Sequence, residues 1–586
     1  AERKARNADG SEKAYSLEAS AMAGSGGLVF AGAGVSAQAS ENGEVNIAVT
    51  SGNNLTAGKA VDIAALNAPA VKAVTGALSG SLLASAAVTV AQANIGTKGK
   101  ALKTSVTIGD NNVLAAETIS VKAETNAKQD VDMQALSISA SPFPGGAAQI
   151  NSGGSSIYSD VTVDAGSNVY RGKALGGNNY GAADLLLEAG NSVSQKVRAS
   201  GISAGTAFAT GTNLAATQAV LTTKVTAAGS KAGSHINDLT VNAKSYAAID
   251  SEANGYGGAL IDISPYAAKV ENEYRADTDV ELSGDWTTDG VVTAGAINGS
   301  DIDLHADAVR AAVVGGSGVW LKNDVSNAAN VAVKDAKITS NGAQVYTAQN
   351  NVDHTGKIDA SGYGGVNVNA SDLNDAFAFT AGVTVDKSEL TALGNSGSIT
   401  AQALTQGTIN STNSLKSAGL VPVSLAASKH KLVYDNSVDI TGSTLKTAKK
   451  DQDITLAASD DTEVRLETIA DTQGGAVGAA SARAENELAR SNKLKVDGNS
   501  YLESTNDVNL YAGANSGGIN SSLGLEVLAD AYNKTVIPVY TAPSVRNTMT
   551  QNNQVEIAGD VGSVRHVNVK AGKGTTTVTE SAREYN

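Results

Sequence analysis

The chain has 586 residues, and its 43 Lys and Arg against 58 Asp and Glu give a formal net charge of −15 at pH 7. Such a charge argues against a nucleic-acid partner. Only 4% of the residues are aromatic, so conventional globular cores are difficult to build, and 62 Gly with only 7 Pro argue against a collagen-like chain. The absence of cysteine excludes disulfides, thiolate metal sites and cysteine nucleophiles.

The beginning of the chain carries no export signal, because residues 1–10 are polar and lack an apolar segment. We therefore expect a fragment or a processed form. The stretch nearest to a membrane span, residues 73–97, is uncharged but contains Gly, Ser, Thr, Gln and Asn throughout. It falls short of the roughly 20 predominantly apolar residues that a transmembrane helix needs, so we predict no transmembrane segment.

A five-residue pattern recurs along most of the chain: aliphatic, any residue, aliphatic, any residue, alanine. Its first four copies close on Ala65, Ala123, Ala189 and Ala243, and the later copies close on Ala306, Ala370, Ala458, Ala512 and Ala571, with weaker ones at Ala348 and Ala403. The long steps between these alanines define a repeat of about 58 residues. Shorter steps between Ala306 and Ala403 suggest a sub-module of about 20 residues.

Each copy has the two-residue alternation of a β-strand, and clusters such as Gly109-Asp110-Asn111-Asn112 supply turns. Strands and turns at a period near 20 predict an all-β protein, a parallel β-solenoid with about 20 residues per coil. About 29 such coils would form a rod about 140 Å long. We expect one continuous solenoid over residues 1–586: less regular coils at 1–44, five long repeats at 45–306, shorter modules at 307–403 and three long repeats at 404–586.

Charge is absent from four long segments, residues 73–97, 133–159, 199–223 and 390–415. One interpretation is that small residues form coils covered by a loop or a neighbouring segment, or simple turns. The other is a docking face for another chain.

The turn followed by Val113–Ala123 and then by a charge-free Ala, Gly and Ser stretch resembles the repetitive passengers of Gram-negative filamentous-haemagglutinin and autotransporter type adhesins, including leukotoxin-like filamentous adhesins. The resemblance covers roughly residues 45–571. It implies a right-handed parallel β-helix exported across the outer membrane. Neither the secretion domain of two-partner systems nor a C-terminal barrel is recognisable in the sequence.

Candidate catalytic and metal-binding residues lack the expected spacing. The five histidines lie far apart in the chain and never form a metal-spaced pair, so we interpret them as surface strand residues: His235, His305, His354, His430 and His566. Acidic residues alternate along three segments and could be paired catalytic acids or cation sites, but are more simply outward strand faces: Asp277, Asp279 and Glu281; Asp301 and Asp303; Asp460, Asp461, Glu463 and Glu467 with Arg465. We predict no catalytic, cofactor or metal site.

Two further features leave alternatives open. Four tyrosines crowd one region near Asp262 and Trp286, and could form a sugar-binding platform or lie as surface strand residues: Tyr246, Tyr256, Tyr266 and Tyr274. Residues 476–492 contain good helix formers, but alternation at Ser481, Arg483, Glu485 and Glu487 favours a strand.

The repetition of one unit favours a structural protein over an enzyme, because an enzyme needs one site that differs from the rest of the chain and in which several polar groups converge. We predict a non-enzymatic, secreted rod at the bacterial cell surface, a structural protein and adhesin. Its expected partners are host or neighbouring cell surfaces, glycans among them, and other copies of the rod through lateral self-association. The alternative is a carbohydrate-active β-helix enzyme or a tailspike-like polysaccharide-binding protein.

Overall fold

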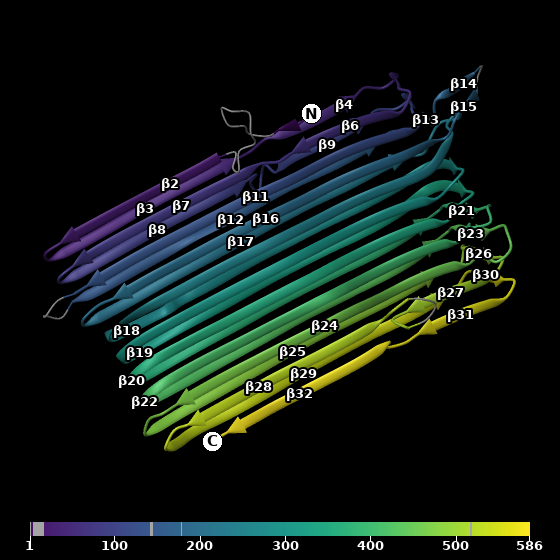
Figure 1. Ribbon diagram of the computed structural model, residues 1–586. Helices are drawn as coiled ribbons and strands as arrows, with labels where there is room; N and C mark the ends of the chain where they lie inside the picture. The colour runs from purple at the N-terminus through teal and green to yellow at the C-terminus, as the bar shows by residue number, and fades with distance from the viewer. Residues whose placement is uncertain (1, 4–16, 141–144, 177–178, 516–518) are drawn as a thin grey trace.

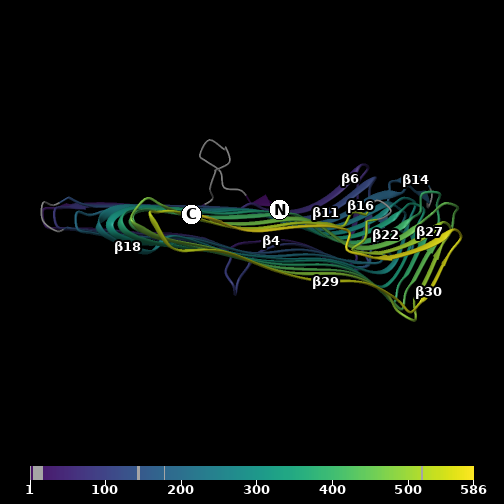
Figure 2. The ribbon, with the colours of Figure 1, turned by 90° about the horizontal axis from the view of Figure 1, so that it is seen from below.

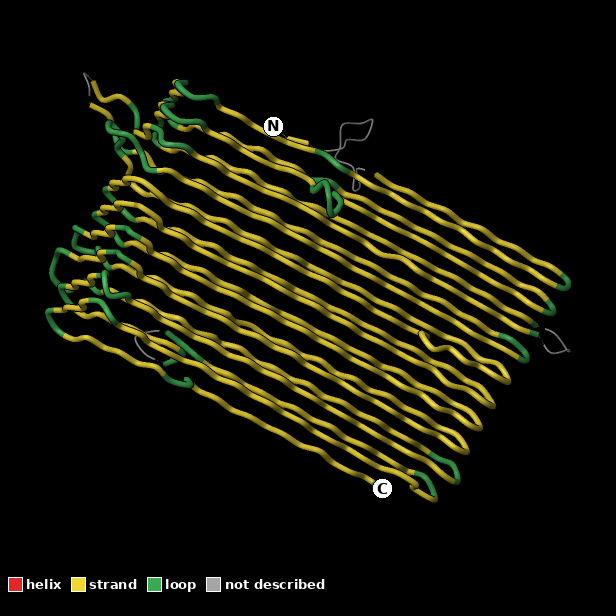
Figure 3. The backbone as a smooth tube through the Cα atoms, turned by 180° about the vertical axis from the view of Figure 1, so that it is seen from behind, coloured by secondary structure: helices red, strands yellow, loops and turns green. Residues whose placement is uncertain are grey.

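The computed structural model describes residues 2–3, 17–140, 145–176, 179–515 and 519–586. Within this part of the chain the regular elements are all β-strands, as predicted (Figure 3). The chain winds as a flattened parallel solenoid whose long strands form two stacked sheets (Figures 1 and 2). We name these sheets the first face, on which the chain runs out, and the second face, on which it returns. They meet at the turn edge, and short strands join them at the opposite, closing edge.

The strands group by their place in this coil. The first face holds β1 (Glu2–Arg3), β2 (Leu17–Gly27), β6 (Ala60–Asn67), β7 (Ala70–Ser81), β11 (Thr118–Ser139), β16 (Ala183–Ala204), β24 (Ile454–Gln473), β27 (Asp507–Ala512), β28 (Ser522–Lys534), β31 (His566–Ala571) and β32 (Thr575–Tyr585). The second face holds β3 (Phe30–Glu41), β4 (Glu44–Val49), β8 (Ala84–Ile95), β9 (Leu102–Ile108), β12 (Gly146–Ala165), β17 (Phe208–Ala228), β25 (Val477–Val496) and β29 (Ile537–Ile557).

Four strands continue through the turn edge and belong to both faces: β18 (Ile236–Thr288), β19 (Val292–Ser340), β20 (Gln344–Asp386) and β22 (Ile399–Thr441). At the closing edge lie β5 (Asn54–Thr56), β10 (Val113–Ala115), β13 (Val169–Arg171), β21 (Glu389–Ala392), β23 (Thr444–Thr447), β26 (Tyr501–Ser504) and β30 (Asp560–Ser563), with an antiparallel hairpin of β14 (Ala174–Gly176) and β15 (Asn179–Tyr180). The segment 476–492, weighed as helix or strand, lies almost entirely in β25 and is a strand.

The coil is about three times as long as the sequence analysis predicts. Ala123 pairs with Ala189, Ala189 with Ala243, and Ala296 with Ala348, so each hydrogen-bonded neighbour lies one whole repeat further along the chain. One repeat of about 58 residues is therefore one coil, not three. About ten coils at ~4.8 Å give a stack of ~50 Å, whereas strands of about 22 residues extend ~70 Å across it. The predicted long rod is wrong; the molecule is a plate.

The closing alanines stack directly on one another, with one correction to the sequence pattern. The ladder passes through Ala65, Ala123, Ala189, Ala243, Ala296, Ala348, Ala403, Ala458, Ala512 and Ala571. Ala306 faces the core further along its strand, opposite Ala253. Val366 and Val368, which the pattern predicts as an inward pair closing on Ala370, point outward on the second face, 42% and 45% exposed. When Ala296 replaces the copies that close on Ala306 and Ala370, the steps between successive closing alanines become regular. The shorter modules predicted at 307–403 are therefore absent.

A buried polar ladder runs two positions beyond the alanines on the first face. It consists of Asn67, Thr125, Asn191, Ser245, Asn298, Asn350, Thr405 and Asp460. The amides of Asn298 and Asn350 cross the interior and donate to the carbonyls of Ala328 and Thr380 on the second face, both at 2.8 Å. These bonds satisfy the buried amide groups and join the two sheets.

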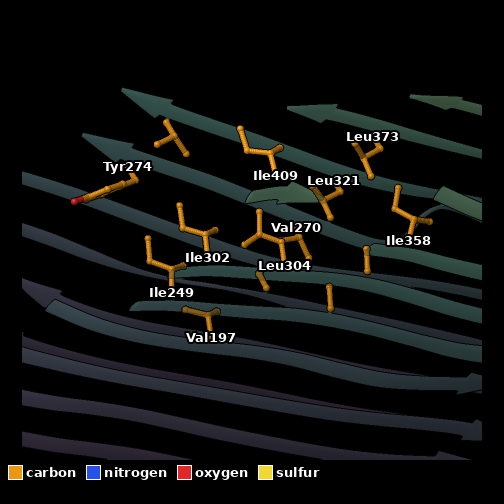
Figure 4. Close-up of a cluster of buried hydrophobic side chains, with 14 of the residues drawn as sticks. Val197, Ile249, Val270, Tyr274, Ile302, Leu304, Leu321, Ile358, Leu373 and Ile409 are labelled. Carbon is orange, nitrogen blue, oxygen red and sulfur yellow. The ribbon is translucent and has the colours of Figure 1, made fainter. Parts of the chain in front are cut away.

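The polar ladder divides the interior into two apolar cores. Ala123 belongs to the core on the closing side, and Ala127 to the core on the turn side, with Thr125 between them. In the turn-side core, aliphatic side chains of both faces interdigitate, for example Ile249 and Ile302 of the first face with Val270 and Leu321 of the second (Figure 4). Small aliphatic side chains fill the narrow space between the two sheets, which explains the scarcity of aromatic residues.

Candidate functional site

The uncharged segments of the sequence gather at one place, the turn edge. Three of the four predicted segments, 73–97, 133–159 and 199–223, contain the turns between the faces. Residues 19–40 do the same in the first coil, and shorter uncharged segments follow at 253–261, 311–321, 360–371, 417–428, 472–482 and 535–545. The fourth predicted segment, 390–415, instead spans β21 and the first-face half of β22. An uncharged band thus follows the turn edge through the whole stack.

Two ionic residues beside these short segments point into the protein rather than out of it. Asp262 on the second face and Arg310 on the first face are both buried, and Arg310 Nη1 lies 3.4 Å from Asp262 Oδ2. Arg310 also donates to Ser203 at 2.9 Å, and Ser264 donates to Asp262 at 2.9 Å. Burial raises the pKa of Asp262, and Arg310 opposes that rise. The pair ties the faces together without adding a charge to the outer surface.

Outward side chains of the band form rows across neighbouring coils. On the second face, the row nearest the turn contains Phe30, Ala84, Gly146, Phe208, Ile261, Val314, Val366 and Val421. On the first face, Leu78, Leu136, Ile202, Tyr256 and Val309 form a matching row. Many of these large side chains are exposed, although an exposed apolar strip of this length is uncommon on a monomeric soluble protein.

Each face has an apolar hollow within the band. The hollow on the second face has a volume of about 430 Å³ and is lined by Ala84, Gly146, Ala148, Phe208 and Ile261, among others. The hollow on the first face, of about 530 Å³, is lined by Met22, Leu78, Leu136, Ile202 and Tyr256, among others. Both are shallow depressions between large and small side chains. Their apolar lining suits contact with another apolar surface.

Two of the histidines predicted at the surface lie in the interior instead, around the carboxylate of Asp375, for which the sequence predicts no role. His430 Nε2 lies 3.1 Å and His354 Nε2 3.5 Å from Asp375 Oδ2, and Ser411 donates to the same oxygen at 2.5 Å. Both histidines and Asp375 are completely buried. Burial alone would raise the pKa of Asp375, but the charge and hydrogen bonds of the two imidazoles hold it well below its usual value.

This cluster contains the residue types of a hydrolase triad but not its arrangement. Ser411 donates to the carboxylate rather than to an imidazole, so the hydroxyl is not activated by a base. Phe377, whose ring centroid lies 5.1 Å from that of His354, packs against the cluster inside the core. A substrate has no path to these buried atoms. The cluster balances a buried charge between the sheets.

A second buried ion pair corrects the assignment of Asp460. This residue points inward and accepts hydrogen bonds from Arg490 and from Asn492, the latter at 2.7 Å, whereas Asp461, Glu463, Arg465 and Glu467 lie outward on β24. Burial raises the pKa of Asp460, and Arg490 opposes that rise. The sequence does carry a signal for such buried ionic residues. Asp375 lies between Leu373 and Phe377 at a position whose side chain points inward by the two-residue alternation of the strand.

The remaining acidic candidates point outward, as predicted, and form two groups that lie on different faces. Asp277, Asp279 and Glu281 are on the second face, where Lys224 lies 3.3 Å from Glu281 and Asn330 donates to Asp279 at 3.0 Å. Asp301 and Asp303 are on the first face. Burial, followed by the nearby Asp279, raises the pKa of Asp277.

The other histidines and the tyrosines are dispersed. His235 and His566 are exposed and pair with Asp289 at 2.7 Å and Asp507 at 3.0 Å, and His305 is half-buried. Tyr274 and Trp286 are buried, whereas three tyrosines are exposed on different faces, Tyr246 and Tyr256 on the first and Tyr266 on the second. The structure does not bring these aromatic side chains together as one platform.

Across the described residues, no group of three or more His, Cys, Asp or Glu side chains is arranged to hold a metal ion. The same residues include no helix long and apolar enough to cross a bilayer. No protein-family model, no curated protein and no solved structure matches the chain. The uncharged band is therefore the candidate functional surface.

Proposed function

We propose that the chain is a secreted structural protein of the bacterial cell surface, an adhesin whose stacked coils present a repetitive plate for attachment. The observation that supports this function best is the uninterrupted alanine ladder, in which one unit repeats from Ala65 to Ala571. A protein built from one repeated unit offers area and multivalent contact rather than one catalytic place. The described surface adds the uncharged band, which repeats in the same way.

Two finer features belong to this proposal. Parallel strands joined by crossovers are right-handed in nearly all proteins, so we propose a right-handed coil. We also propose export across the outer membrane of a Gram-negative cell, which the absence of cysteine suits because it leaves no thiol to oxidise on the way.

Adhesion of protein-coated beads tests the function. Beads that carry the folded chain should be retained on bacterial or host cell layers, while beads that carry Val241→Asp, which disrupts the core, should be retained less. The same preparation should release no reducing ends or unsaturated sugars from a panel of polysaccharides. Release that is lost in Asp277→Asn would establish the carbohydrate-active alternative instead.

A further inference from the structure

The uncharged band is widest on the second face of the first four coils. There β3, β8, β12 and β17 contribute the uncharged segments 30–40, 84–97, 146–159 and 208–223 (Figure 1). The outward side chains of these four segments are small, apolar or uncharged polar, among them Phe30, Ala84, Gly146 and Phe208 in the row nearest the turn. We call this surface the second-face patch.

Charge restricts what can approach the patch and how. The chain carries a net charge of −15, and these segments contribute nothing to it. Two copies that met through their charged surfaces would repel each other, whereas two patches can meet without placing like charges in contact. A strongly charged partner would gain nothing from an uncharged surface. The surface therefore favours an uncharged, apolar counterpart, which a second copy supplies.

The shape of the patch is complementary to itself along one row of side chains, because projecting side chains lie beside a hollow. Phe30 and Phe208 project from it, 73% and 55% exposed, and Ala84 and Gly146 lie between them in the hollow of about 430 Å³. A projection beside a hollow on the same row suits a two-fold axis that lies between the two facing sheets and runs parallel to their strands. Phe208 of each copy then enters the hollow of the other, with Gly146 close to the axis.

The area is sufficient for a stable dimer. Four strands at ~4.8 Å, each contributing about 12 residues at ~3.3 Å, cover about 800 Å² per copy. About 1,600 Å² in total is the size of an ordinary specific protein interface. We propose that two copies of this chain associate face to face through the second-face patch, with Phe208 as the central anchor. This inference rests on the proposed function and names the partner for its self-association.

Sedimentation of the full chain tests the proposal. At about 50 µM the wild-type protein should be dimeric, and added salt should strengthen the dimer by screening the repulsion between acidic copies. Phe208→Lys places a charge in the hollow of the partner and should weaken association at least tenfold. Tyr246→Lys, at another exposed aromatic residue on the opposite face, is the matched control and should associate like the wild type. Thermal unfolding should show both variants folded.

Cross-linking gives an independent readout because the chain has no native cysteine. Gly146→Cys lies near the proposed axis, where an added Cβ finds its nearest neighbour at 3.9 Å, and should form a disulfide-linked dimer rapidly under mild oxidation. Asn126→Cys, exposed on the first face, should not. A monomeric wild type, equal cross-linking at both positions, or binding of the patch to neutral lipid vesicles in place of dimerisation would overturn the proposal. A monomer that still adheres to cells would overturn only this inference, and a dimer that does not adhere would overturn only the proposed function.

Discussion

Ala189 and Ala243 lie directly opposite each other on neighbouring strands, although a whole repeat of the chain separates them. Each is completely buried, and each continues the ladder on either side. One turn of the solenoid therefore contains two long strands, a turn edge and a closing edge. The repeat seen in the sequence is therefore a single coil of the solenoid.

Deletion of residues 190–243 should remove one coil and leave the protein folded. Ala189 would join Lys244, which stacks on Gly190, so the ladders keep their register. Each coil contacts only the coils next to it, so the rest of the stack should be unaffected. The stack should become shorter by one strand spacing, ~5 Å, and not by three strand spacings. Electron microscopy that counts strands, together with thermal unfolding, checks this. Collapse of the deletion variant would contradict the stacking.

Val241→Asp should be more harmful than that large deletion. Val241 is completely buried between Leu187 and Ala294, and a carboxylate there has no partner. The desolvation of the new charge opposes folding by several kcal/mol. Asn242→Asp adds the same charge at the next position, which faces outward opposite Glu188, and should lower the free energy of unfolding by no more than about 1 kcal/mol. Equal effects in a denaturation experiment would show that the register is wrong.

Asp375→Asn should destabilise the turn-side core at neutral pH. The change leaves two buried imidazoles without their carboxylate, and loss of one partner from a buried ionic cluster costs about 3–5 kcal/mol. Asp372→Asn, on the outward face of the same strand, should have a small effect. Denaturant unfolding at pH 7 compares the two variants.

Acid should weaken the wild type through the same residue. The pKa of Asp375 is lower in the folded protein than the value of about 3.9 expected when unfolded. The folded state therefore binds fewer protons, so this contribution is complete above about pH 4 and is lost as the pH falls toward the folded pKa. Unfolding measured below pH 4 should be less steeply pH-dependent in Asp375→Asn than in the wild type. An unchanged slope would contradict the assigned role.

Arg490→Ala and Arg483→Ala should separate buried from exposed ion pairs on one strand. Arg490 is buried with Asp460, whereas Arg483 lies exposed beside Glu485. The first change leaves a buried carboxylate without its cation and should cost about 3–5 kcal/mol, and the second about 0–1 kcal/mol. Comparison of their unfolding free energies tests whether Asp460 lies inside the protein.

Much of the fold could be predicted from the alternation of small aliphatic residues. The pairs that close on Ala123, Ala189 and Ala243 face inward as expected, because a two-residue period fixes which face of a strand is buried. The period cannot say how long a strand continues before it turns. Alternation persists through all of β11, so the strand continues far beyond the five-residue pattern that closes on Ala123 before it reaches the turn edge. A coil length estimated from the pattern and its nearby turns is therefore too short.

The interior sites were harder to predict because they depend on contacts between coils. Asp375 meets His430 from the next coil, 55 residues later, and polarity alone suggests an outward position for both. Val366 and Val368 show the opposite failure, since apolar pairs of the pattern can also face outward in the uncharged band. Parity carried along each strand assigns these residues correctly: relative to Leu373 and Phe377 for Asp375 and the two valines, and relative to the buried Leu432 for His430.

The most direct test of the account is a distance between two coils. Lys122 and Gln402 lie in one outward row, connected through Glu188, Asn242, Gly295 and Thr347. Five strand spacings place them about 24 Å apart, whereas coils of about 20 residues would place them about 67 Å apart. Cysteines at these two positions can be spin-labelled and their separation measured by electron paramagnetic resonance. A distribution centred on the shorter of these distances, broadened by the label arms, is the predicted result, and one centred on the longer distance would contradict the one-coil repeat.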